Sequence, residues 1–142
     1  MRTDVDERMS SRLGWVALGG FLGLAAWVAI GSLGLLVLRV AWHDYALAEP
    51  LKLYSPAMLA ARLAVAAIAC VAGGFVAARP AGAAGAWAAG SLLLVLSLPI
   101  HLVDVWADYP AWYHAVYLLM LVPVTGIGGS FGGSRARVHV SA

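Results

Sequence analysis

Four long apolar runs, separated by short polar stretches, dominate the pattern of this chain. Each run is long enough to cross the ~30 Å hydrocarbon core of a bilayer as a helix, which takes about 20 residues. Lipid admits only helices or closed barrels as spanning structures, and strand-like alternation is absent from these runs. The pattern therefore predicts an all-α, polytopic membrane protein, a four-transmembrane-helix bundle with short loops. The four helices are expected at about residues 13–40, 56–78, 81–107 and 110–131.

The predicted membrane domain occupies residues 13–133 and leaves two short tails, 1–12 and 134–142. No charge lies between Arg12 and Arg39 in the first run. This run is much longer than the 7–15 apolar residues of a secretory signal peptide. We therefore expect an uncleaved first helix.

Composition supports this picture and excludes other classes. Of 142 residues, 63% are hydrophobic and 11% are charged, with a mean hydropathy of +0.87. Soluble domains are about 45–50% apolar and about 25% charged. The net charge is +2 and no block of Lys and Arg is present, so nucleic-acid binding has no electrostatic basis. A lone cysteine, Cys70, excludes an internal disulfide and C-x-x-C redox chemistry.

The distribution of basic residues predicts the orientation. With four spans, the basic residues of the first side are Arg2, Arg8, Arg12, Arg79, Arg135 and Arg137. The opposite side carries Arg39 and Lys52. The positive-inside rule then places both tails in the cytoplasm. The preference for Arg over Lys and the high Ala content favour a bacterial source, and hence the inner membrane.

Small residues recur every four positions, as close helix packing in membranes requires. Gly19 and Gly23 form one such motif, Cys70 and Gly74 lie on a second ridge, and the last helix ends with a third motif at Gly128 and Gly132. These residues predict a tightly packed bundle. The alternative is that one ridge forms the seam of a homo-oligomer.

Aromatic residues gather at the expected ends of the spans. This placement is typical of the interfacial belt, in which Trp and Tyr rings rest at the level of the lipid headgroups. The residues are Trp15, Trp42, Trp106, Trp112, Tyr45, Tyr54, Tyr109 and Tyr113.

Four polar residues of the third expected helix, Ser97, His101, Asp104 and Asp108, follow one another at spacings of four, three and four. Residues spaced in this way share one helical stripe. Pro99 interrupts the stretch and removes a backbone hydrogen bond, which predicts a kink. Ionisable groups within spans are candidate functional residues because burying them in lipid is costly.

A shared site is predicted where the third and fourth helices meet. His114 lies at the same expected depth as His101, and Tyr117 lies one turn further in. We expect Asp104 to orient the His101 ring. Arg62, in the second helix, either extends to the outer surface or pairs with an acid of a neighbouring helix.

The chemistry of this outer His/Asp cluster stays open. It is consistent with a polar rim, with a proton or cation path, with a zinc or copper site, or with haem or quinone bound by two histidines. No cofactor is predicted, and the metal, if any, is not specified. Protease, hydrolase and P-loop motifs are absent, so we do not expect an enzyme.

Two functions are compatible with this sequence. The first is transport or conduction of a small solute or ion. Polar residues crowd the outer third of the spans, so a conducting path requires an oligomer. The second is a non-enzymatic accessory or anchor subunit of a larger membrane complex. The bilayer is the expected partner in both cases, and neither a substrate nor a protein partner follows from the sequence.

Overall fold

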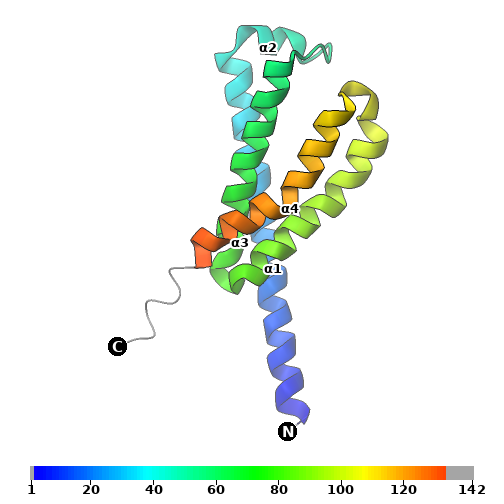
Figure 1. Cartoon of the computed structure of the whole chain (residues 1–142). Helices are drawn as coiled ribbons and strands as arrows, with labels where there is room; N and C mark the ends of the chain where they lie inside the picture. The colour runs from blue at the N-terminus through cyan, green and yellow to red at the C-terminus, as the bar shows by residue number, and fades with distance from the viewer. Residues whose placement is uncertain (1, 134–142) are drawn as a thin grey trace.

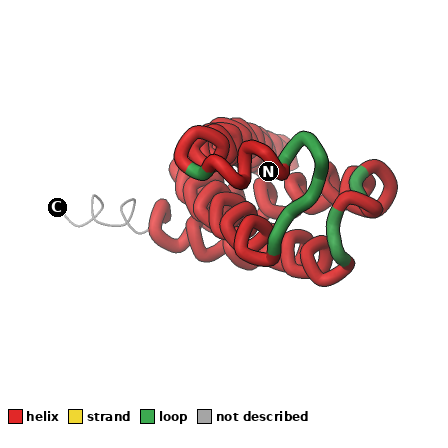
Figure 2. The backbone as a smooth tube through the Cα atoms, turned by 90° about the horizontal axis from the view of Figure 1, so that it is seen from above, coloured by secondary structure: helices red, strands yellow, loops and turns green. Residues whose placement is uncertain are grey.

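The computed structural model describes residues 2–133, with side chains from residue 9 onward. Viewed from above, this described part consists of helices joined by short loops, without strands (Figure 2). The predicted all-α class is thereby confirmed. The elements are α1 (Arg2–Ala41), α2 (His43–Ala48), α3 (Pro56–Pro99), the π-helix η1 (Ile100–Asp104), the 3-10 helix η2 (Trp106–Asp108) and α4 (Ala111–Gly133).

Three of these helical stretches are long and apolar enough to cross a membrane: Met9–Ala41, Pro56–Asp104 and Ala111–Gly133. The second and third expected helices therefore belong to one element, α3. This helix is interrupted at Gly82, whose φ of 61° and ψ of −149° are open almost exclusively to glycine. Figure 1 shows the two arms of α3, 56–81 and 83–99, running in opposite directions.

The helices form two hairpins that meet at one end and diverge at the other. The arm 56–81 runs beside α1, and the arm 83–99 runs beside α4 (Figure 1). The start of α1 and the end of α4 lie at the closed end, whereas α2 and η2 lie at the open end. The open end corresponds to the outer side expected from the sequence.

Glycine and alanine make the close contacts of the closed end. A methyl group on Gly19 would lie 2.6 Å from the Ala77 carbonyl oxygen. One on Gly23 would lie 2.8 Å and 2.9 Å from the Cβ atoms of Ala77 and Ala89, which belong to different arms of α3. One on Gly74 would overlap the backbone of α4. Three segments therefore meet at Gly23 without room for a side chain.

The remaining small residues that the sequence singled out also lie at helix contacts. A methyl group on Gly128 would overlap the Val71 carbonyl group, and one on Gly132 would meet that of Phe75. Cys70 is fully buried in the apolar core beside Leu93 and other residues.

Two boundaries and one additional helix differ from what was expected. Helix α1 begins at Arg2 rather than at residue 13, and no Gly or Pro precedes Gly14 to interrupt it. The first outer loop contains the short helix α2, which the hydropathy pattern does not reveal. Helix α3 ends at Pro99 rather than near 107, because the chain continues there as a π-turn closed by the bond from Val105 N to Ile100 O at 3.0 Å.

Candidate functional site

His101 and His114 face each other across the open end of the second hairpin. Their Nδ1 atoms are 2.9 Å apart, and Nε2 of His114 lies 3.2 Å from the carbonyl oxygen of Trp106. A carbonyl oxygen only accepts, so Nε2 of His114 carries the hydrogen. In the uncharged pair, Nδ1 of His101 must therefore donate to Nδ1 of His114. This leaves Nε2 of His101 without a hydrogen bond among the described residues.

Stacking fixes the orientation of both imidazole rings. His101 stacks on Tyr117 with ring centroids 4.2 Å apart, and His114 stacks on Trp106 at 4.7 Å. Ser97 is buried and faces the Tyr117 hydroxyl. The structure thus brings together four of the expected residues, namely Ser97, His101, His114 and Tyr117.

The two aspartates do not join this group. The π-turn η1 changes the helical register after Pro99, so Asp104 lies on the exposed side instead of one α-helical turn above His101. The expected contact between Asp104 and His101 is therefore missing. Asp108 binds Lys52 Nζ at 2.6 Å, and this bond raises the pKa of Lys52.

Arg62 is the centre of a second polar cluster, formed mainly by tyrosine hydroxyls. Its Nη1 donates to Tyr45 at 2.5 Å and to Tyr54 at 3.4 Å, and its Nη2 donates to Tyr109 at 3.2 Å. Its Nη1 also lies 3.5 Å from Glu49. The Arg62 side chain is only 16% exposed. The arginine therefore reaches the expected acid of a neighbouring segment, yet most of its partners are neutral.

Glu49 is shared between two arginines. Arg39 binds both of its carboxylate oxygens, one of them through Nη2 at 3.1 Å. The hydrogen bond from Arg39 is the main cause that lowers the pKa of Glu49. Burial raises the pKa of the neighbouring Tyr45 hydroxyl, so this hydroxyl stays protonated. Arg39, Arg62 and Glu49 together carry one positive charge in excess.

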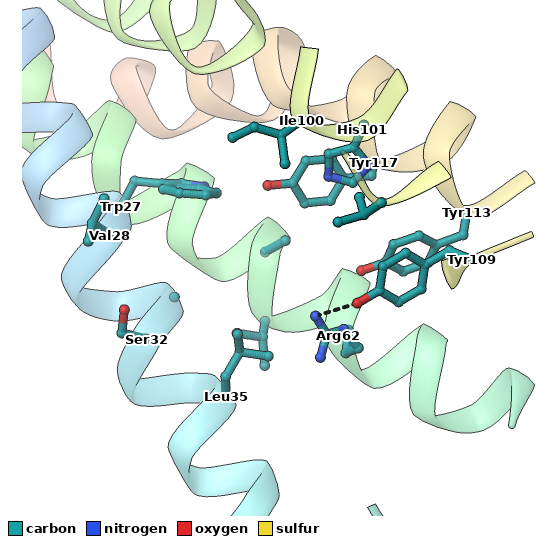
Figure 3. Close-up of a pocket in the computed structure, with 14 residues that line it drawn as sticks. Trp27, Val28, Ser32, Leu35, Arg62, Ile100, His101, Tyr109, Tyr113 and Tyr117 are labelled. Atoms are coloured by element: carbon teal, nitrogen blue, oxygen red, sulfur yellow. Dashed lines mark hydrogen bonds between the residues drawn. The ribbon is translucent and has the colours of Figure 1, made fainter. Parts of the chain in front are cut away.

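A cavity of about 340 Å³, which we call the chamber, lies between the two hairpins (Figure 3). Trp27, Val28 and Ser32 of α1 line one side of it. Arg62 lines a second side, and Figure 3 shows its bond to Tyr109. The remaining side carries Ile100, His101, Val105, Tyr109, Tyr113 and Tyr117. The volume falls at the lower end of the range for small-molecule sites.

Two buried donors of the chamber walls lack a partner. Among the buried side-chain nitrogen and oxygen atoms of the described residues, two nitrogens make no hydrogen bond: Nε of Arg62 and Nε1 of Trp27. The Trp27 indole faces the thiol of Cys70, a weak acceptor. Leaving a buried donor unsatisfied costs about 1–3 kcal/mol. The Trp27 donor is directed to Cys70 in the core, whereas the Arg62 side chain lines the chamber, so Arg62 is the group that an acceptor in the chamber would bind.

The metal and haem alternatives fit this geometry poorly. In the part of the chain that the structure describes, no three His, Cys, Asp or Glu side chains gather as metal ligands. The contact between Nδ1 of His101 and Nδ1 of His114 leaves no space for an iron between them. A haem bound by this pair would require both rings to turn.

Comparison with known proteins identified no family for this chain. A scan of family models, a search of curated proteins and a search of solved structures gave no match to this chain.

Sequence reasoning identified His101, His114, Tyr117 and Arg62 but not the role of the other aromatic residues. The tyrosines expected in an interfacial belt instead direct their hydroxyls toward Arg62, and Tyr45 is completely buried. Trp27 was not singled out either. The available signal was Arg62 itself, because a cation within a span needs partners and hydroxyls at the span ends supply them.

Proposed function

We propose that the protein is a multi-pass integral membrane protein in which α3 crosses the bilayer twice. At 1.5 Å per residue, the arm 56–81 measures about 39 Å and the stretch 83–104 about 33 Å, so each matches a ~30 Å core. The distribution of basic residues supports cytoplasmic termini in a bacterial inner membrane. Reporter enzymes fused after Pro50 and after Ala142 test this topology. A fusion after Ala142 that is active only outside the cytoplasm contradicts it.

We further propose that the protein acts by binding a small molecule in the chamber and has no enzymatic activity. The observation that carries this proposal is the cavity itself, which has the largely buried Arg62 side chain, only 16% exposed, in its wall. Native proteins leave few buried polar groups without partners. A largely buried arginine with an unsatisfied Nε in the wall of a cavity favours a ligand site over a polar rim.

The closed end of the bundle favours binding over conduction by a single chain. Below the chamber, the segments approach one another at glycines such as Gly23 and Gly74. The buried hydroxyl of Thr125 in this region donates to the Leu121 carbonyl oxygen at 2.6 Å and is thus satisfied within its own helix. No further polar group continues a path there among the described buried side chains. This arrangement fits an accessory subunit that holds a ligand.

Transport is the second candidate, and the connection between the hairpins supports it. The hairpins are joined at Gly82 and meet through small residues and through a shared apolar cluster that includes Cys70, Leu93 and Leu121; in a transport cycle they would rock about Gly82 as two units. Purified protein that moves solutes across liposomes, or that assembles into a homo-oligomer, would favour transport. A strictly monomeric protein without flux favours the accessory role.

Accessibility to a membrane-impermeant maleimide tests the chamber directly. In a Cys70→Ala background, we expect Ser32→Cys, which lines the chamber, to react from the outer side. Leu33→Cys is the matched control, because this neighbouring residue is exposed but lies outside the chamber wall. Ala89→Cys, in the closed end, should not react. If Ser32→Cys reacts no faster than Ala89→Cys, the chamber is not a water-accessible site.

A further inference from the structure

We infer that the chamber binds an amphipathic anion, with a carboxylate or phosphate group held at Arg62 and a flat apolar body between the aromatic walls. This inference rests on the binding role proposed above and adds the chemical class of the ligand. It follows from charge, from hydrogen-bond geometry, from the shape of the walls and from the direction in which the chamber is open.

The charge balance around Arg62 favours an anion. Arg39 binds both oxygens of Glu49, whereas Arg62 approaches the same carboxylate at 3.5 Å through a single nitrogen. Asp108 is paired with Lys52, so it does not compensate Arg62. The Arg62 cluster therefore keeps one positive charge without a counterion among the described residues. In a partly buried, low-dielectric site, such a charge attracts anions strongly.

The arrangement of the hydrogen-bond donors of Arg62 matches the oxygens of an acid group. A guanidinium presents its five donors in a planar fork that matches carboxylate or phosphate oxygens. Tyrosine hydroxyls occupy the Nη1 and Nη2 atoms, the Tyr113 hydroxyl also faces the guanidinium, and the buried Nε makes no hydrogen bond. An anion at this edge would accept from Nε and displace a neutral hydroxyl.

The walls fit a flat apolar body. Tyr109, Tyr113 and Tyr117 present nearly parallel rings, with interplanar angles of 25° and 24° between successive members. Trp27 lies across from them, as Figure 3 shows. Aromatic rings stack favourably on planar groups. Besides Arg62 and His101, the walls carry the hydroxyls of Ser32 and of the tyrosines, and the other lining residues, such as Leu35 and Val65, are apolar.

The chamber is open at the level of the apolar spans. Val28 of α1 and Ile100 of η1 line it, and these residues are 49% and 48% exposed. A ligand with an apolar body therefore reaches the site from the outer leaflet. Two sources share this chemistry: a free amphipathic carboxylate and the headgroup of an anionic phospholipid.

Equilibrium binding of 2-naphthoate to the full chain tests the inference. The protein is placed in nanodiscs of zwitterionic phosphatidylcholine, and empty nanodiscs give the background. We expect saturable binding of 2-naphthoate and much weaker binding of the neutral 2-naphthol and of a naphthylmethylammonium cation. Arg62→Gln should weaken 2-naphthoate binding about 10- to 100-fold, the range for a lost charge-assisted hydrogen bond. Arg79→Gln, at the closed end, is the matched control and should leave the affinity unchanged.

Two variants that keep Arg62 make the test independent of whether Arg62→Gln folds. Glu49→Gln removes the competing carboxylate and should strengthen 2-naphthoate binding several-fold. Tyr109→Phe removes the neutral hydroxyl that occupies Arg62 Nη2 and frees this donor for the ligand, so it should also strengthen binding several-fold. An unchanged affinity in both variants, or equal binding of the anion and the cation, overturns the inference.

The source of the ligand follows from a second series. Phosphatidylglycerol is added to the nanodiscs, and its competition with 2-naphthoate is measured. Competition that depends on Arg62 identifies a lipid headgroup as a ligand, whereas 2-naphthoate binding without competition identifies a free carboxylate; both support an anionic ligand. Labelling of Ser32→Cys without any preference for anions leaves the binding role intact and refutes the ligand class. Failure of Ser32→Cys labelling refutes the binding role itself.

Discussion

The closed end of the bundle depends on glycines that allow backbones to touch, and Gly74→Ala tests this dependence. A methyl group at this position would overlap the carbonyl oxygen and carbon of Thr125 in α4. The obstacle is backbone, so no side-chain rotation relieves it and the helices must separate. Overpacking of this kind costs about 1–3 kcal/mol.

The comparison with Gly14→Ala isolates that cost. Nothing lies within 4 Å of a methyl group built on Gly14, although this residue also lies inside a helix. The intrinsic preference of a helix for Ala over Gly, at most about 1 kcal/mol, applies to both variants and cancels in their difference. We therefore expect Gly74→Ala to be less stable than Gly14→Ala by about 1–3 kcal/mol. Gly31→Ala, with its nearest atom at an ordinary 3.8 Å, should resemble Gly14→Ala.

The free energy of unfolding measured by reversible denaturant titration in mixed micelles provides the assay, with near-ultraviolet circular dichroism as the signal. If Gly74→Ala proves as stable as Gly14→Ala, α3 and α4 do not approach each other as described. A loss of stability equal in all three variants would point to a general effect of replacing glycine, and the packing argument would be wrong.

Three further outcomes are expected. The hydrogen bond from Arg39 lowers the pKa of Glu49 below its ordinary value of 4.5 in the folded chain. The contribution of Glu49 to stability is therefore complete above pH 4.5 and is lost as the pH falls through the lower folded pKa. The dependence of the unfolding midpoint on pH should accordingly be shallower at acid pH in Glu49→Gln than in the wild type. His101→Phe keeps a ring to stack but leaves His114 Nδ1 buried without its partner, so the free energy of unfolding should fall by about 1–3 kcal/mol. Cys70 is fully buried, so a maleimide should modify the unfolded chain much faster than the native one, and equal rates followed by mass spectrometry would show that the core is open.

The sequence predicts the helical class and the position of the apolar segments because hydropathy and length determine them directly. It also predicts that His101 and His114 lie at one depth, since a short connection between antiparallel segments fixes their relative height. The position of Asp104 could not be predicted in the same way. The spacing argument assumes a regular α-helix, and the π-turn after Pro99 breaks that assumption.

The tyrosines show why the candidate site itself was only partly predictable. Hydropathy locates Tyr45 and Tyr109 at the ends of spans, where either an interfacial ring or an inward hydroxyl satisfies the same pattern. The choice between them depends on Arg62, which lies in a different segment and needs acceptors at its own depth. The chamber is likewise a consequence of how far the two hairpins diverge, and that angle depends on which glycines touch at the closed end. A binding site of this kind is therefore a property of tertiary packing. The residue that indicates it in the sequence is Arg62, because a charge within a span needs partners.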